Sequence, residues 1–130
     1  MEWNITNGRP VYVQLVEQLE LALVNGTFPP GSKVPPVREL AADAGVNPNT
    51  MQRALAELER CGLVYSQRNA GRFVTEDRTM IENAKRELAR RHIRTFVENM
   101  GRLGYREEEI VSLLRQETNE EGEQHVGSGM

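Results

Sequence analysis

A proline at position 48 stands directly before a run with helical spacing, and this placement constrains the fold more than any other feature. Pro48 lies between Asn47 and Asn49 in the stretch GVNPNTMQRAL. Inside a helix a proline removes a backbone hydrogen bond, but at the first helical position no donor is lost and its fixed φ suits the helix. Asn47 is a favourable N-cap, because its side-chain oxygen can accept from a backbone N–H of the first turn. The stretch therefore predicts a helix that begins at Pro48, and its apolar spacing extends this helix to Cys61.

The residues before this helix predict a second, shorter helix. Prolines at positions 35 and 36 set its start at Val37, and Gly45 ends it after Ala44. Two helices joined by a short turn that contains glycine are typical of a helix-turn-helix. The outward positions of the helix that begins at Pro48 all carry side chains that form hydrogen bonds: Asn49, Thr50, Gln52 and Arg53.

Two β-prone runs follow the pair of helices. Residues 63–65 (LVY) and 73–75 (FVT) flank an Asn-Ala-Gly turn, which predicts a β-hairpin. A further helix, begun near Pro10 and ended by an Asn-Gly pair, precedes the Pro-rich connector TFPPGSKVPP. We therefore expect a mostly α fold with a small β-hairpin, in which a flexible arm (residues 1–9) precedes a winged helix-turn-helix domain (residues 10–76).

The pattern changes after the hairpin. Apolar residues keep helical spacing over roughly two dozen positions, and a last helix follows whose first turn holds three glutamates, at the positive end of the helix dipole. A helical hairpin this short cannot enclose its own core, so we expect residues 77–117 to form a dimerisation region, with ordinary core packing as the alternative. Residues 118–130 lack periodicity and predict a disordered tail. The expected interface residues are Leu88, Ile93, Phe96, Val97, Met100, Leu103, Ile110 and Leu114.

The composition excludes several classes of protein. Hydrophobic residues make up 38% and charged residues 27% of the chain, and no apolar run reaches the roughly 20 residues that span a bilayer, so no membrane partner is expected. The first residues lack a signal-peptide pattern and the single cysteine permits no internal disulfide, which favours the cytoplasm. The net charge is −3 and neither half of the chain is basic, so any DNA-binding face must be a local cluster.

Nearly all of residues 10–75 resemble a known family. The stretch PVYVQLVEQLELALVNGTFPPGSKVPPVRELAADAGVNPNTMQRALAELERCGLVYSQRNAGRFV is similar to the winged-helix domain of GntR-family bacterial transcription regulators. The matching features are the proline-led first helix, G-x-x-x-P-G, P-x-x-R-x-L-A, N-x-N-T and the G-L-V before the wing. In the short tail, LGYREEEIVSLL resembles the YtrA-type subfamily. The chain departs from the family at Val34-Pro35-Pro36, where Leu-Pro-Ser is common, and at Arg106, where Ser or Thr is common.

This resemblance implies a homodimeric, sequence-specific DNA-binding transcription regulator. Two copies of the recognition helix (48–61) and of the wing (66–72) would bind an inverted-repeat operator in double-stranded DNA. We expect a repressor of its own operon, with transporter genes among the targets because they often accompany YtrA-type members. An unidentified small-molecule effector would bind between the tail helices and the winged domain. The alternative is a winged-helix protein–protein interaction module that binds no DNA.

The expected DNA contacts come partly from the resemblance and partly from the residues themselves. The resemblance maps a DNA-contacting arginine to Arg38, for which a solvated helix arginine or a partner of Asp43 is the alternative. Gln52 has the geometry to read adenine with two hydrogen bonds. Arg53 either contacts DNA or pairs with Glu57, and the wing arginines either enter the minor groove or stay solvated. The full set of expected contacts is Lys33, Arg38, Asn49, Thr50, Gln52, Arg53, Arg68, Asn69, Gly71 and Arg72.

The remaining reactive side chains predict no catalytic, cofactor or metal site. His92 has only arginines near it in the sequence, and no His, Cys, Asp or Glu group has the spacing of metal ligands. No nucleophile–base pair or phosphate-binding loop is present, so we expect no enzyme. Cys61 is expected to be a small packing residue, and the basic run over residues 85–94 a solvated helix face rather than a DNA contact.

Overall fold

The computed structural model describes the backbone of residues 1–129 and the side chains of residues 1–119. It divides into two compact units, one formed by residues 1–87 and the other beginning at Leu88. The first unit contains α1 (Val11–Val24), α2 (Val37–Ala44), α3 (Pro48–Arg60), β1 (Val64–Gln67) and β2 (Gly71–Val74). α4 (Arg78–Arg102) begins in the first unit and ends in the second, and α5 (Glu107–Gly129) lies in the second.

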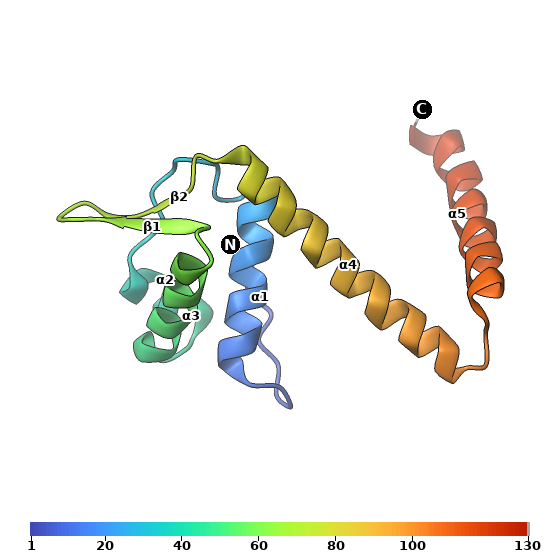
Figure 1. The fold of residues 1–130 in the computed structure, drawn as a ribbon, viewed down its shortest axis with the longest axis horizontal. Helices are drawn as coiled ribbons and strands as arrows, with labels where there is room; N and C mark the ends of the chain where they lie inside the picture. Colours follow the sequence, from blue (N-terminus) through green and yellow to red (C-terminus); the bar gives the residue numbers. More distant parts are fainter. Residues whose placement is uncertain (130) are drawn as a thin grey trace. The chain divides into compact units, whose positions relative to one another are not determined.

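The first unit is a winged helix-turn-helix, which confirms the predicted fold class. α3 packs against α1, α2 and β1. Figure 1 shows α2 and α3 beside one another, with the hairpin of β1 and β2 extending to the left above them. The two strands pair antiparallel, from Val64 opposite Val74 to Gln67 opposite Gly71.

The Pro-rich connector pairs briefly with β2, as a short third segment at one edge of the hairpin. Lys33 forms a bridge with Phe73, and the Val34 N–H donates to the Arg72 carbonyl at 2.9 Å. The sequence predicts only a rigid connector here. An edge is where a proline-flanked segment fits in a sheet, because a proline has no N–H to donate to a second neighbour.

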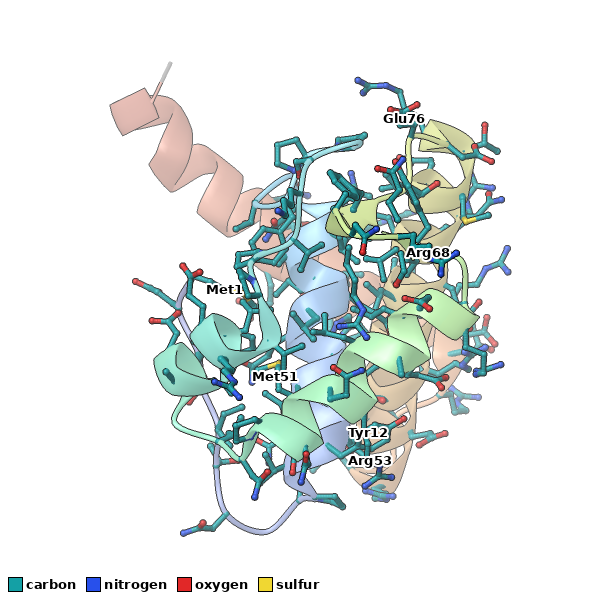
Figure 2. The ribbon with its side chains drawn as sticks, turned by 90° about the vertical axis from the view of Figure 1, so that its left-hand side faces the viewer. Met1, Tyr12, Met51, Arg53, Arg68 and Glu76 are labelled. Atoms are coloured by element: carbon teal, nitrogen blue, oxygen red, sulfur yellow. The ribbon has the colours of Figure 1, made fainter. Side chains whose placement is uncertain are left out.

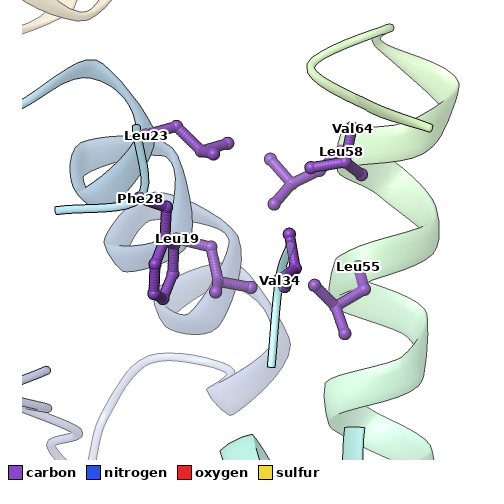
Figure 3. Close-up of a pocket in the computed structure, with 7 residues that line it drawn as sticks. All are labelled: Leu19, Leu23, Phe28, Val34, Leu55, Leu58 and Val64. Carbon is purple, nitrogen blue, oxygen red and sulfur yellow. The ribbon is translucent and has the colours of Figure 1, made fainter. Parts of the chain in front are cut away.

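The core of the first unit lies between α1 and α3. Figure 3 shows leucines of both helices converging on a shared space with residues of the connector and of β1. Most of these side chains are buried, as the helical spacing predicts. The residues that surround this space are Leu19, Leu23, Phe28, Val34, Leu55, Leu58 and Val64.

The N-terminal arm is not the free segment that the sequence predicts. Trp3 and Ile5 pack against the core, and the indole Nε1 of Trp3 donates to Asp43 Oδ2 at 2.9 Å. Gln14 is only 3% exposed, and its amide bonds to both the N–H and the carbonyl of Thr6, at 2.8 Å each. The arm is held because its two apolar side chains are buried against the core and because the Gln14 amide forms hydrogen bonds with its backbone.

The start of α4 also belongs to the winged-helix unit. Asp77 caps this helix, since its Oδ1 accepts from the N–H groups of Thr79 and Met80 at 3.0 and 3.2 Å. Met80 and Ile81 pack against the core. The boundary between the units therefore lies inside α4, about ten residues after the predicted boundary at 76, because the first turns of this helix pack their apolar side chains against the core.

α5 begins as the sequence predicts and continues further. The Arg106 N–H donates to Glu109 Oε1 at 3.0 Å, which is the half of a capping box that the glutamate of the first turn supplies. α5 extends to Gly129, and Met130 lies outside the described residues. The disordered tail expected over residues 118–130 stays a prediction. The Thr118 hydroxyl donates to the Leu114 carbonyl at 2.9 Å, and no proline follows it to end the helix.

Candidate nucleic-acid interface

The interface that the sequence predicts is built on the start of α3. Asn47 Oδ1 accepts from the Asn49 N–H at 2.8 Å, and Pro48 occupies the first turn, as predicted. Gly45 ends α2 with φ 71°, a left-handed conformation that suits glycine, and the Val46 N–H returns to the Ala41 carbonyl at 3.0 Å. The turn between the helices is therefore hydrogen-bonded on both sides, which holds the first turn of α3 in a defined position.

α3 separates its core face from a polar face. Met51, Ala54, Leu55 and Leu58 are buried. Asn49, Gln52 and Arg53 are exposed, and Thr50 is half-buried. The polar side chains that the sequence places outward are therefore available to a partner.

Arg38 is exposed in the first turn of α2. The pairing with Asp43, weighed as its alternative, is not found among the side chains described, and Asp43 instead accepts the bond from Trp3. The guanidinium of Arg38 is accordingly available to bind a phosphate or a base edge.

Arg53 has a partner that the sequence did not suggest. Its guanidinium carbon lies 4.4 Å from the centre of the Tyr12 ring, a cation–π contact between α3 and α1 that can be followed in Figure 2. The alternative partner, Glu57, pairs with Arg60 instead, and the hydrogen bond from Arg60 holds the pKa of Glu57 below its ordinary value. Arg53 is thus oriented by an aromatic ring and not by an acid on its own helix.

The tip of the wing carries an exposed arginine on a defined turn. Arg68 and Asn69 are exposed, and Asn69 has φ 65°, a conformation that asparagine tolerates better than most residues. Gly71 has φ 104°, and a Cβ built there would lie 3.1 Å from Lys33 Cε. The Lys33 side chain therefore extends along the wing to Gly71, close to the turn, which places its positive charge with those of the wing arginines.

Arg72 is held between the wing and α3. Its Nε lies 3.4 Å from Glu59 Oε1 and its Nη1 lies 3.4 Å from Gln52 Oε1, and its side chain is only 19% exposed. Glu59 also accepts from the Ser66 hydroxyl at 2.6 Å. The hydrogen bond from Ser66, followed by that from Arg72, lowers the pKa of the Glu59 carboxyl. The sequence treats Arg72 as a DNA contact, whereas the structure gives it partners within the chain.

Three residues that hold the expected DNA contacts in place could not be predicted from the sequence. Glu59, Ser66 and Tyr12 each act through a residue distant in the chain, so no local motif marks them. The hairpin register does carry a signal for one of them: Ser66 lies opposite Arg72, which places both beside the same acid.

Cys61 differs from its expected role. It is exposed at the end of α3, not a packed residue. Partial burial of the sulfur nevertheless raises the pKa of its thiol, which makes it less reactive than an ordinary cysteine.

The second unit leaves most of the expected interface residues uncovered in the single chain. Leu88 and Met100 are half-buried, and Ile110 is buried by its own chain. The others are exposed apolar side chains: Ile93, Phe96, Val97, Leu103 and Leu114.

Two further kinds of site were sought over the part of the chain that the structure describes. Within it, no three His, Cys, Asp or Glu side chains gather as metal ligands would. None of the helices described there combines the length and the apolarity that crossing a bilayer requires.

A helix-turn-helix whose second helix exposes a polar face, beside a basic hairpin, defines a winged-helix protein. The model of the family described as bacterial regulatory proteins, gntR family, matches residues 11–74. The HTH-type transcriptional regulator YhcF of Bacillus subtilis is 36% identical over 115 residues, which cover 88% of this chain and 95% of that protein. The chain belongs to the GntR family, whose members are transcriptional regulators and not enzymes.

Further likenesses support this assignment. The HTH-type transcriptional repressor YtrA of Bacillus subtilis is 32% identical over 92 residues, which cover 70% of this chain and 71% of that protein. A GntR family transcriptional regulator from Listeria monocytogenes has a TM-score of 0.80 at 36% identity, covering 86% of this chain and 98% of the other. The DNA-binding domain of AraR, solved in complex with operator ORE1, has a TM-score of 0.50 at 28% identity, covering 58% and 94%. The resemblance seen in the sequence is thereby confirmed.

Proposed function

We propose that this chain is a homodimeric repressor that binds an inverted-repeat operator through α3 and the wing. The observation that carries the proposal is the polar first half of α3, which is exposed and hydrogen-bonded into position while its other face is buried. Two likenesses support it: YtrA is named a repressor, and the AraR domain was solved with an operator.

The recognition helix enters the major groove by its N-terminal end. Asn49 and Thr50 lie at the positive end of the helix dipole, where short polar side chains suit phosphate oxygens. Gln52 lies one turn further, at a position to reach base edges. Arg53, stacked on Tyr12, contributes a positive charge at the α1 side of the helix.

The remaining contacts flank the helix. Arg38 binds phosphates or nearby bases from the start of α2. Arg68, with Asn69 and Gly71 at the wing tip, reaches the adjacent minor groove, where a narrow groove attracts arginine. Lys33, whose side chain reaches Gly71, adds a phosphate contact along the wing. These basic groups form a local cluster on a chain whose net charge is −3.

The second unit supplies the dimer interface. Its exposed apolar side chains would be covered by the same surface of a second copy, as a twofold interface requires. Two recognition helices would then read half-sites about one helical turn apart, roughly 34 Å. We expect the operator to lie in the regulator's own operon, with transporter genes among the targets, and the protein to act in the cytoplasm. A small-molecule effector stays a prediction from the sequence.

The test begins with Arg38→Ala. This change is expected to weaken binding of the operator by on the order of 1–3 kcal/mol, because a charged contact is lost from an exposed position that holds no core. Binding of labelled duplexes by fluorescence anisotropy measures it. Arg60→Ala is the matched control, since Arg60 is an exposed arginine in the last turn of α3 that pairs with Glu57.

A salt titration separates the proposal from its alternative. Operator binding should fall steeply between low and moderate salt, because phosphate contacts release counterions. Duplex binding that is absent or insensitive to salt would instead support the protein–protein interaction module.

A further inference from the structure

Arg72 occupies a bridging position between the wing and the recognition helix. Although it lies on β2, both of its side-chain partners belong to α3: Glu59 near the end of the helix and Gln52 near its start. At 19% exposed, its side chain lies along the protein instead of projecting from it. An arginine placed in this way is poorly disposed to reach a phosphate.

The bridge restricts the orientation of the Gln52 amide. A guanidinium has only donors, so the amide must present its oxygen, and not its NH₂, to Arg72. The Gln52 oxygen accepts from Arg72 Nη1 at 3.4 Å, which leaves the NH₂ group as the part of the amide that is free to point elsewhere. Gln52 itself is exposed, so this NH₂ group is available to a partner.

Arg72 is in turn held by the wing and the helix together. Ser66 donates to the same Glu59 oxygen that lies beside Arg72, and Ser66 is paired directly with Arg72 across the hairpin. The order of contacts is therefore Ser66, Glu59, Arg72 and Gln52. Since Glu59 pairs with the guanidinium and Gln52 accepts from it, Arg72 has a defined place within the chain itself.

We propose that Arg72 is a positioning residue for Gln52, which makes Gln52 read a base edge as a hydrogen-bond donor. This inference rests on the proposed function, because it assumes that α3 lies in the major groove. A glutamine free to rotate pairs bidentately with adenine by accepting from N6 and donating to N7. With its oxygen turned to Arg72, Gln52 instead favours guanine or thymine, which offer acceptors at O6 and N7 or at O4, and disfavours cytosine, which offers only a donor.

The experiment compares base preferences of the full chain and its variants. A pool of DNA duplexes with randomised central positions is selected by the wild type, by Arg72→Met and by Gln52→Ala. The position that loses its preference in Gln52→Ala is the one that Gln52 reads. There the wild type should prefer guanine or thymine over adenine by on the order of fivefold or more, and Arg72→Met should reduce this preference to below about twofold.

A second arginine of the wing is the matched control. Arg68→Met removes the same group from an exposed site at the wing tip, and it should weaken binding but leave the preference at the Gln52 position unchanged, because the wing contacts a different part of the operator. In a Gln52→Ala background, Arg72→Met should cause no further change in preference, because its effect passes through Gln52. Glu59→Gln keeps Arg72 but weakens the contact that holds it, so it should shift the base preference in the same direction as Arg72→Met. It replaces Arg72→Met in the test if circular dichroism shows that Arg72→Met does not fold.

The outcomes separate the two hypotheses. A wild type that selects no sequence refutes DNA recognition and the positioning role with it. A wild type that selects a sequence supports the proposed function, and the positioning role is then overturned by any of three results. These are a preference for adenine at the Gln52 position, an unchanged preference in Arg72→Met and Glu59→Gln, or a uniform loss in Arg72→Met that matches Arg68→Met.

Discussion

At the residue scale, Asn47 and Pro48 together decide where the recognition helix begins. The Asn47 oxygen takes the N–H of Asn49, one of the donors that the start of a helix leaves unpaired, and the proline has no N–H to leave unpaired. Both effects are local, since they need nothing beyond a few consecutive residues. The first turn of α3 is where the expected DNA contacts lie, so the cap also positions the interface.

Replacing the cap tests this directly. Asn47→Ala should lower the free energy of unfolding by about 1 kcal/mol, because the Asn49 N–H loses its acceptor. Urea denaturation followed by circular dichroism measures the change. Asn47→Asp keeps an acceptor oxygen at the same place and should remain close to the wild type. An equal loss in both variants would show that the cap is not the cause.

At the scale of elements, side chains from one segment satisfy or neutralise groups in another. Glu59 of α3 holds Ser66 and Arg72 of the two strands, so the wing is attached to the recognition helix by polar contacts. Gln14 of α1 holds the N-terminal arm through its buried amide. The polar surface of the unit is therefore ordered by contacts between elements as well as by the core beneath it.

The contacts of Glu59 with Ser66 and Arg72 predict that the stability of the fold depends on pH. Its folded pKa lies below the ordinary value of 4.5, so the charged carboxylate stabilises the folded state above that value and this contribution is lost as the pH falls through the folded pKa. The difference in unfolding free energy between the wild type and Glu59→Gln should be constant near neutral pH and shrink below about pH 4.5. Because the side chain is 40% exposed, solvent screening keeps the difference below about 1 kcal/mol. Denaturation curves of both proteins across this pH range measure the difference. A difference that stays constant would contradict the lowered pKa of Glu59.

The arm can be followed through the single tryptophan of the chain, Trp3. Gln14→Leu should release the arm, because the backbone groups of Thr6 and Arg9 lose their partners, and should lower the unfolding free energy by about 1–3 kcal/mol. Released into water, Trp3 should emit at longer wavelength. Gln18→Leu removes a more exposed amide that bonds to Asn4, and it should have the smaller effect. Unchanged emission in Gln14→Leu would show that the apolar contacts alone hold the arm.

At the scale of the whole molecule, the two units differ in how much they bury. The winged-helix unit has a continuous core, whereas α4 has no fully buried residue and the second unit exposes several large apolar side chains. Contiguous exposed apolar surface on a single chain is typical of an interaction site. Association in pairs would cover this surface and supply two recognition helices.

Charged substitutions in the second unit test the association. Replacing Leu88 and Phe96 together with glutamate should convert dimers to monomers in multi-angle light scattering, because buried unpaired charge opposes an apolar interface. Leu21→Glu is the control, since Leu21 is a 54% exposed leucine of α1 outside the expected interface. A mass that stays dimeric in the double variant would place the interface elsewhere.

Much of the fold follows from short-range patterns that the sequence alone carries. The starts of α2 and α3, the glycine between them, the buried faces of the helices and the hairpin were all predicted, because each depends on propensity, capping or periodicity over a few residues. The family was evident for the same reason, since its motifs are runs of neighbouring residues. The exposure of Arg38, Gln52 and Arg68 was also predicted, from the helical spacing and from the hairpin turn.

The chain by itself therefore determined the winged-helix elements and the residues that face outward, whereas the tertiary structure decided which of those residues have partners. Arg53 on Tyr12, Arg72 between Glu59 and Gln52, and the arm on Gln14 all join residues that are distant in sequence. Periodicity assigns a side chain to a face, but it does not say what lies opposite that face. Only the packing of α1, α3 and the hairpin brings these groups within hydrogen-bond or stacking distance, and it makes Arg72 a bridge instead of a free wing arginine.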